Sequence, residues 1–394
     1  TASVKGELHP ARGAGTLALQ LSDASKALAW AQKLPGASAA MAGAQARGSA
    51  SLQGSWGGGW RDPAVQLSAK VPTLGWQAAG NAQSTEPIEL RDVALMVDGR
   101  LAQAQLKLSG HARQGDRRAD LRLSATGGRT TPQAELAQSG WRASLTELNA
   151  RLQDPALGEG TWQLASQAPV PLAWAPAKGA QRGGQFEAGA GELLVSSPAP
   201  VAQARLAWGP VRWRAGQLST TGRLTGLPLQ WVERVAGAQL QDAGLSGDIV
   251  FNGDWDATLG QQLRVTANLA RASGDLSVLT NDAQTGIQSR VAAGLRDARL
   301  ALRSEGRALN LAVVWDSERA GTVNGQLRTE LSAVRGDSGD THWSWPAAAP
   351  LQGQLQARLP EISAWSVLAP PGWRLRGALA ADVRVPGPRS APLA

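Results

Sequence analysis

The sequence predicts an all-β fold: an elongated, repetitive, antiparallel-rich sheet that has one apolar face and carries a few short helices. Two observations predict it. Apolar and polar residues alternate with a period of two along most of the chain, which is typical of strands with one oily and one solvated face. Turn signals recur every ~10–15 residues, a spacing that suits antiparallel hairpins and is too short for βαβ units.

The alternation marks the expected strands. It is clearest at residues 101–109, 119–125, 244–255, 263–269, 309–313, 323–331, 351–359 and 375–385. Sequences rich in Gly, Asp and Ser separate these stretches and predict turns at 114–116, 127–128, 304–307 and 335–340.

Three short segments have helical spacing instead. The first, 22–36, has a possible N-cap at Ser22 or Asp23 and ends at Pro35 and Gly36. The second, 227–237, has Pro228 as its expected first helical residue, and the third, 359–372, has Pro360 in the same role. Helices this short are marginal alone, so we expect their apolar faces to be docked on the sheet.

These helices suggest a repeated unit of helix, strand, turn and strand. We therefore expect residues 1–226 to form the N-terminal part of a continuous sheet, 227–360 to form one repeat unit, and 361–394 to begin a further, truncated repeat. Because the sequence starts at Thr1 without a signal sequence and stops within the phrase GPRSAPLA, we expect an internal segment of a longer protein.

The composition excludes several classes of function. Cysteine is absent, which rules out disulfides and thiolate metal sites. Lys and Arg outnumber Asp and Glu by 39 to 31, but the basic residues are dispersed among polar ones, so we expect no nucleic-acid partner. The apolar residues are mainly Ala, Leu and Val, which predicts an aliphatic lining, and no apolar run is long enough to span a bilayer.

Candidate catalytic groups are sparse. His9, His111 and His342 lack metal-ligand spacing, and the sequence GDSGD at 336–340 resembles a serine-protease loop but is also ordinary turn chemistry. Carboxylates such as Asp120, Asp248, Asp275 and Asp382 occur singly on polar faces, which favours solvation over a converging acidic site. We expect no enzyme activity, no catalytic or metal-binding residues and no cofactor.

Tryptophan is the aromatic residue that the chain uses most. Trp56, Trp60, Trp255, Trp315, Trp343, Trp345 and Trp373 fall near expected strand ends or turns. At such positions an indole ring either closes the end of a core or sits at a membrane interface, and we favour core closure.

The phrases LTGLPLQWVERVAG, LSGDIVFNGDWD, LAVVWDSERAGTVNGQLRTEL and WSWPAAAPLQGQLQARLPEISAWSVLAPPGWRLRGALAADVRVPG resemble the large interior region of the TamB family, the translocation and assembly module subunits, which are related to the AsmA-like bridge-type lipid transfer proteins. The resemblance is strongest over 220–394. It implies that the sheet curls into a trough with an apolar concave interior, with residues 1–226 as the N-terminal part of this continuous β-trough. It also implies a place in the periplasm of a Gram-negative envelope, inner-membrane anchored in the full-length protein. It also implies docking to a BamA-like outer-membrane barrel protein through regions outside this segment, and roles in outer-membrane protein assembly and phospholipid movement.

Two functions are consistent with these features. The first is a conduit that shields phospholipid acyl chains between the inner and outer membranes, and the second is a scaffold for the assembly of outer-membrane β-barrel proteins and autotransporters, with a filled sheet or with edges offered for strand addition. Four glycines alternate in phase with the apolar residues and so belong to the apolar face: Gly247, Gly325, Gly353 and Gly377. They favour the conduit, because they leave room that a packed core would not. The expected groove-lining residues are Leu245, Ile249, Phe251, Leu263, Val265, Leu269, Leu309, Leu311, Val313, Val323, Leu327, Leu331, Leu351, Leu355, Leu359, Leu375, Leu379, Val383 and Val385.

Overall fold

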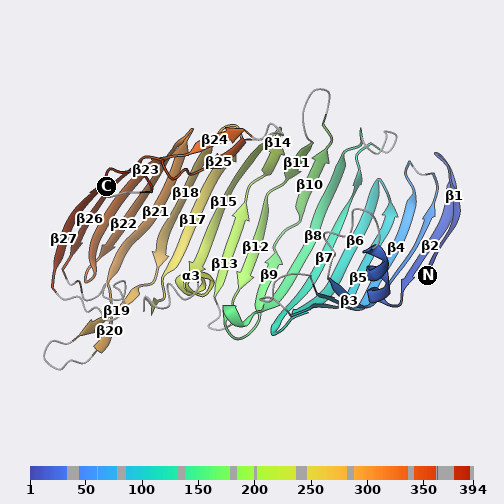
Figure 1. Ribbon diagram of the computed structural model, residues 1–394, viewed down its shortest axis with the longest axis horizontal. Helices are drawn as coiled ribbons and strands as arrows, with labels where there is room; N and C mark the ends of the chain where they lie inside the picture. Colours follow the sequence, from blue (N-terminus) through green and yellow to red (C-terminus); the bar gives the residue numbers. More distant parts are fainter. Residues whose placement is uncertain are drawn as a thin grey trace. The chain divides into compact units, whose positions relative to one another are not determined.

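The computed structural model describes all residues except 33–43, 60, 78–85, 132–137, 178–183, 199–201, 237–245, 282–287, 336–340, 361, 363–376 and 391–394. The chain divides into two compact units, residues 1–201 and 202–394, and each is described here by itself. Both consist almost entirely of antiparallel strands, so the all-β fold class is confirmed (Figure 1).

The first unit is a meander of long strands. They are β1 (Ala2–Leu8), β2 (Gly13–Leu21), β3 (Gln45–Gly57), β4 (Ala64–Gln77), β5 (Ile88–Arg100), β6 (Gln103–Gln114), β7 (Arg117–Arg129) and β8 (Trp141–Gln153). Each pairs antiparallel with the next along the chain. The predicted strand at 101–109 overlaps β6, which begins at Gln103, and the one at 119–125 lies within β7; the predicted turn at 114–116 joins β6 and β7.

Beyond β8 the strands of the first unit become short. One half of β8 pairs with β9 (Trp162–Ser166) and the other with β10 (Val170–Ala175). Next to these lie β12 (Gly191–Ser196), paired with β9, and β11 (Gln185–Ala188), paired with β10. The Ser166 hydroxyl accepts a hydrogen bond from the Leu148 N–H (2.9 Å), so a side chain supports β8 where its partner strand is interrupted.

The second unit continues the same design. Its strands are β13 (Gln203–Trp208), β14 (Val211–Arg214), β15 (Gln217–Pro228), β17 (Val250–Leu259), β18 (Arg264–Ser273), β21 (Leu295–Glu305), β22 (Ala308–Ser317), β23 (Gly321–Glu330), β26 (Leu351–Leu359) and β27 (Leu379–Val385). β13 and β14 both pair with β15, and from β15 to β27 each strand in this series pairs antiparallel with the next. The strands predicted at 263–269, 309–313, 323–331, 351–359 and 375–385 overlap β18, β22, β23, β26 and β27.

The helices are short, as expected. α1 (Ala24–Ala31) starts at the predicted N-cap Asp23, whose carboxylate accepts from the Ser25 N–H at 2.9 Å. Its buried Ala24 and Leu28 pack against Ala46 in β3, close to Leu74 and Trp76 of β4. α3 (Leu229–Ala236) follows directly on β15, and Pro228 is the last residue of that strand, not the first of the helix. The third predicted helix lies largely outside the described residues, as does the Pro35–Gly36 stop of the first.

The turn between β3 and β4 is tied to neighbouring strands. The Asp62 carboxylate accepts from Arg100 Nε (2.9 Å) and from the Ala102 N–H (2.8 Å). The buried Arg129 side chain donates to the carbonyl of Arg61 (2.6 Å). Burial alone would raise the pKa of Asp62, but these hydrogen bonds and the charges of Arg100 and Arg129 lower it below its ordinary value.

The predicted strand at 244–255 is wrong as a single element. β16 (Ser246–Gly247) belongs to a small separate sheet with β19 (Leu276–Asn281) and β20 (Gln288–Ala292), and β17 begins only at Val250. Between them Ile249 is 2% exposed, in a cluster with Leu276 and Leu295. Alternation within the sequence could not reveal this break, because residues far along the chain cause it.

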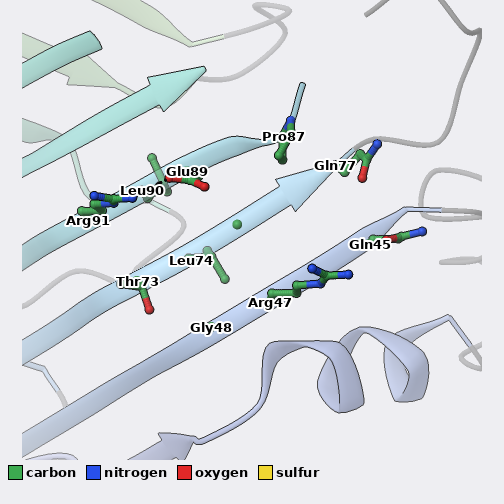
Figure 2. Close-up of a pocket in the computed structure, with 11 residues that line it drawn as sticks. Gln45, Arg47, Gly48, Thr73, Leu74, Gln77, Pro87, Glu89, Leu90 and Arg91 are labelled. Atoms are coloured by element: carbon green, nitrogen blue, oxygen red, sulfur yellow. Dashed lines mark hydrogen bonds and ion pairs between the residues drawn. The ribbon is translucent and has the colours of Figure 1, made fainter. Parts of the chain in front are cut away.

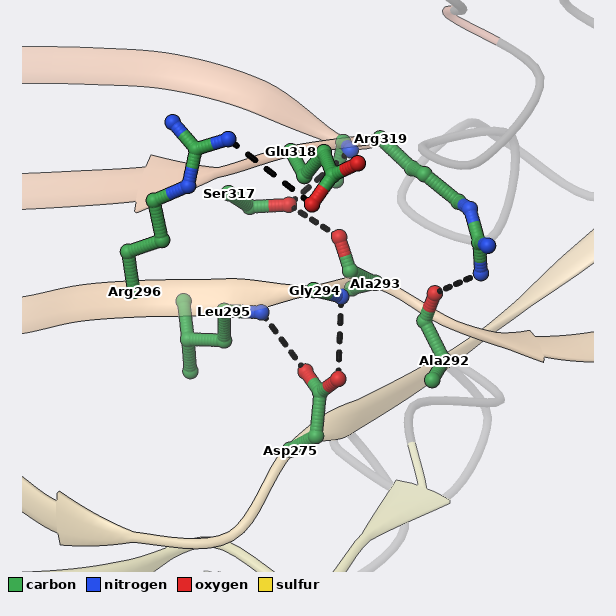
Figure 3. A network of polar contacts seen from close by, with 10 residues as sticks. Asp275, Ala292, Ala293, Gly294, Leu295, Arg296, Ser317, Glu318 and Arg319 are labelled. Atoms are coloured by element: carbon green, nitrogen blue, oxygen red, sulfur yellow. Dashed lines mark hydrogen bonds and ion pairs between the residues drawn. The ribbon is translucent and has the colours of Figure 1, made fainter.

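A polar network holds the small sheet to the turns of β21 to β23 (Figure 3). The Asp275 carboxylate accepts from the N–H groups of Gly294 and Leu295, both at 2.9 Å. The buried Ser317 hydroxyl donates to the carbonyl of Ala293 (2.8 Å) and accepts from the Ala320 N–H (2.9 Å). Buried backbone groups that have no sheet partner are thereby satisfied.

The predicted turn at 127–128 is wrong. Gly127 and Gly128 do not form a turn but lie inside β7, where a side chain on Gly128 would come within 2.2 Å of the Ala102 backbone. The lack of a side chain at these glycines therefore allows neighbouring backbone segments to come close.

Candidate functional site

The strand register of the second unit brings most predicted lining residues onto one face. Directly opposed residues of antiparallel strands share a face, and one such row runs from Leu269 through Leu300, Val313, Gly325 and Leu355 to Val383. The predicted residues on this face are Val265, Leu269, Leu309, Leu311, Val313, Val323, Leu327, Leu351, Leu355, Leu359, Leu379, Val383 and Val385. We call it the apolar face of the second unit.

Much of this apolar face is accessible to solvent. Leu355 is 43% exposed, Leu300 41% and Val383 40%. In a two-sheet sandwich such central positions would be almost fully buried. In the part of the chain that the structure describes, no second sheet covers them. Leu359, at the end of β26, is buried.

The remaining predicted lining residues are placed differently. Ile249 and Leu263 lie outside the strands and are buried, and Leu331 lies in the connection after β23. Phe251, opposed to Arg271 of β18, is on the apolar face by register, but it packs against the Ile249 cluster. Ile249 in particular is a core residue that closes the end of the sheet, so its assignment to the lining is wrong. Leu245 and Leu375 lie outside the described residues.

The first unit has an equivalent apolar face that the candidate set omitted. One row of opposed residues runs through Leu17, Gly54, Leu67, Val97, Leu106, Ala125, Leu145 and Val170. Alternation at 101–109 and 119–125 signalled this face, but the resemblance that selected the candidates was strongest after residue 220. We call it the apolar face of the first unit.

An apolar cavity of about 410 Å³ lies on the apolar face of the first unit. Val97, Leu101 and Leu106 line one side of it. The other side is a row of directly opposed aromatic residues, Trp141, Trp174 and Phe186, from β8, β10 and β11. On a flat sheet, β5 and β11 would be about 24 Å apart. The sheet of the first unit must therefore be concave here for both sides to line one cavity.

On the apolar face of the second unit, side chains of neighbouring strands occupy the space beside two of the glycines. A Cβ on Gly325 would lie 3.2 Å from a methyl group of Leu355, and one on Gly353 would lie 3.1 Å from a methyl group of Leu327. These glycines therefore do not leave open gaps, contrary to the sequence-based interpretation. Gly377 has open space around it, and a Cβ on Gly247 would meet the backbone at Asp275.

Tryptophan and glycine are paired in both units. The Trp56 ring lies over Gly15, where a Cβ would come within 2.0 Å of the ring. The Trp255 ring lies in the same way over Gly222, with a corresponding distance of 2.1 Å. Trp56 is the next-to-last residue of β3, as the sequence predicted, whereas Trp255 lies in the middle of β17. In both pairs the flat indole ring covers a glycine on the apolar face. Trp60 and Trp373 lie outside the described residues.

The opposite faces are polar. On the first unit, Gln45 and Arg47 of β3, Thr73 and Gln77 of β4, and Glu89 and Arg91 of β5 surround a notch of about 370 Å³ over Gly75 (Figure 2). Glu89 and Arg91 form an ion pair at 2.8 Å. Leu74 also lines this notch, and together with Trp76 it packs against the α1 cluster.

The described residues hold no group of His, Asp and Glu side chains that could bind a metal ion. His111 pairs with Asp120 across β6 and β7 at 2.5 Å, and both side chains are half-exposed on the polar face. The GDSGD sequence lies outside the described residues. What the described side chains offer is an extended apolar surface.

No helix among the described residues has the length and hydropathy needed to span a membrane. Comparisons with protein-family models, with curated proteins and with solved structures find no match to this chain.

Proposed function

We propose that the chain is a periplasmic β-trough segment of a TamB-like envelope protein, which shields acyl chains and conducts phospholipid between the inner and outer membranes in support of outer-membrane biogenesis. The observation that carries this proposal is the continuous, half-exposed apolar face that each unit presents on one side of its sheet. The inner-membrane anchor and the contact with a BamA-like barrel would belong to regions outside this segment.

The energetics favour a lipid occupant. Exposed aliphatic surface costs about 25 cal/mol per Å² in water, and extended apolar patches on soluble proteins usually mark binding sites. An acyl chain of ~16 carbons would cost ~13 kcal/mol to expose to water, at about 0.8 kcal/mol per CH₂. Transfer from a bilayer to an aliphatic face is nearly neutral by comparison. The apolar face thus lowers the free-energy barrier to moving an acyl chain out of a bilayer, and no covalent bond is made or broken.

The cavity of the first unit suits such an occupant. Its aromatic row, Trp141, Trp174 and Phe186, is more than one third exposed and faces aliphatic Val97 and Leu106. Flexible acyl chains pack well against both kinds of surface, because dispersion contacts need no directional partner. We expect this cavity to hold one acyl segment most persistently.

Photocrosslinking tests the proposal. A phosphatidylglycerol with a diazirine in one acyl tail is added to the chain in mild detergent and irradiated, and the labelled peptides are mapped by mass spectrometry. We expect labels at Leu106 and Leu172, on the apolar face, and not at Lys107, on the polar face. Leu106→Gln should lower labelling of the cavity several-fold, whereas the matched Lys107→Gln should not. Equal labelling of both faces would contradict the proposal.

A second candidate is the scaffold for β-barrel assembly. It is favoured by the strands at the sheet edges: among the described residues β1 pairs only with β2, and β27 only with β26. Such edges can accept an added strand. If irradiation labels no apolar-face residue, while an unfolded outer-membrane barrel protein protects the amides of β27 from hydrogen exchange, the scaffold replaces the conduit.

A further inference from the structure

The polar face of the second unit contains a depression of about 800 Å³. Its floor is formed by Ala301 of β21 and Ala312 of β22, directly opposed residues with small side chains. Longer polar side chains stand around them. These are three arginines and several carboxamides, Arg303, Arg328, Arg384, Asn310, Gln326 and Gln352.

The strand register, not the sequence, assembles this group. Asn310 of β22 is opposed to Arg303 of β21 on one side and to Arg328 of β23 on the other. Arg303 and Arg328 are therefore two strand spacings apart, roughly 10 Å. Arg384 of β27 lies two strands beyond Arg328 and one pleat along, roughly 12 Å away. The arginines form a spaced row instead of a tight cluster.

The charges of these arginines are available to a ligand. Each has a carboxylate two residues along its own strand: Glu305, Glu330 and Asp382. The described contacts join none of these carboxylates to its arginine, although Arg299 in the same sheet binds Asp297 through both carboxylate oxygens. Asp382 instead lies within 3.5 Å of the amide groups of Gln354 and Gln356.

We propose that this depression binds an anionic, hydroxyl-rich polymer, namely a carboxylate-bearing polysaccharide. Spaced guanidinium groups match carboxylates that repeat along a chain. Carboxamides both donate and accept, as hydroxyl groups do, so the Asn and Gln side chains between the arginines suit sugar hydroxyls. A nucleic-acid strand would call for aromatic side chains on which bases stack, and none lines the depression. The site lies opposite the apolar face and does not depend on lipid binding there.

The test uses polygalacturonate oligomers as the probe, with the 394-residue chain and isothermal titration calorimetry at low salt. We expect binding that weakens with added salt and is absent for neutral dextran. Arg328→Gln should weaken it roughly fivefold, and Arg303→Gln with Arg384→Gln should weaken it further. The control is Arg299→Gln, which removes an arginine of the same sheet that is paired with Asp297 and lies outside the depression, and which should change affinity less than twofold.

Several results would overturn the proposal. These are no binding of polygalacturonate at low salt, an equal loss in Arg299→Gln, or equally tight binding of a single-stranded oligothymidylate, which would indicate only general attraction between charges. Circular dichroism of each variant shows whether the sheet is intact. A variant that loses its β-sheet spectrum is replaced by the corresponding Lys substitution, which keeps the charge but not the bidentate geometry and should still weaken binding.

Discussion

Replacement of Leu355 by Asp measures how open the apolar face of the second unit is. Leu355 lies on β26 between Gly325 and Val383, and 43% of it is exposed. Full burial of a leucine contributes about 1.5–3 kcal/mol, so a side chain that is little more than half buried should contribute about 1–2 kcal/mol. The new carboxylate would remain hydrated at the open surface and would not pay the full cost of burying a charge.

The matched control is Gln326→Asp on the neighbouring strand. Gln326 lies on the polar face, opposed to Ala312 and Gln354, so the new carboxylate meets no directly opposed charge. Both substitutions carry the same low β-propensity of Asp. In urea denaturation followed by circular dichroism, Leu355→Asp should therefore cost about 1–2 kcal/mol more than the control. An excess above about 4 kcal/mol would show a packed core, and equal losses would refute the strand register.

Three further outcomes are expected. Gly222→Val should destabilise the second unit by about 1–3 kcal/mol, because its Cβ would collide with the Trp255 ring; Gly222→Val should be less harmful in a Trp255→Ala background, and equal losses in both backgrounds would contradict this. Asp275→Ala should leave the backbone N–H groups of Leu276, Gly294 and Leu295 without this acceptor and so speed hydrogen exchange in β19 and β20, whereas exchange at wild-type rates would mean that the network is dispensable. Asp62→Asn should lower the free energy of unfolding at pH 7, because the pKa of Asp62 is depressed in the folded state; that difference should shrink as the pH falls through the folded-state pKa, and a difference independent of pH would argue against the ionised contact.

The alternation of apolar and polar residues predicted much of the fold. It placed residues such as Val265, Leu327 and Leu355 on one face, because a period of two fixes sides without any knowledge of which strands pair. The Gly- and Asp-containing sequence at 114–116 predicted a turn, and Gly115 there has a positive φ of 58°. Local hydrogen-bond chemistry limited the helix cap to Ser22 or Asp23, and Asp23 is the cap in the structure.

Features that depend on distant residues were out of reach. The strand expected at 244–255 is interrupted because Ile249 packs into a cluster with residues from 276 to 320. Gly325 and Gly353 suggested gaps, but leucines of neighbouring strands fill them, and this depends on register. The same holds for Arg303, Arg328 and Arg384, which look dispersed in the sequence and line one depression in the sheet.

The concave cavity of the first unit also depends on long-range geometry. Trp141, Trp174 and Phe186 are separated along the chain by stretches with little pattern, and only the pairing of β8, β10 and β11 aligns them. Curvature of a sheet comes from twist and from interruptions such as the break after Ser166, neither of which alternation encodes.

Native mass spectrometry with lipid extraction tests the central claim most directly. The chain is purified from Gram-negative cells in mild detergent, and its bound lipids are counted beside those of a β-sheet protein with no exposed apolar face. If the apolar faces hold acyl chains, phospholipid will accompany the chain in at least equimolar amount, and it will be depleted in Leu106→Gln but not in Lys107→Gln. Phospholipid no more abundant than in the control protein would contradict the conduit.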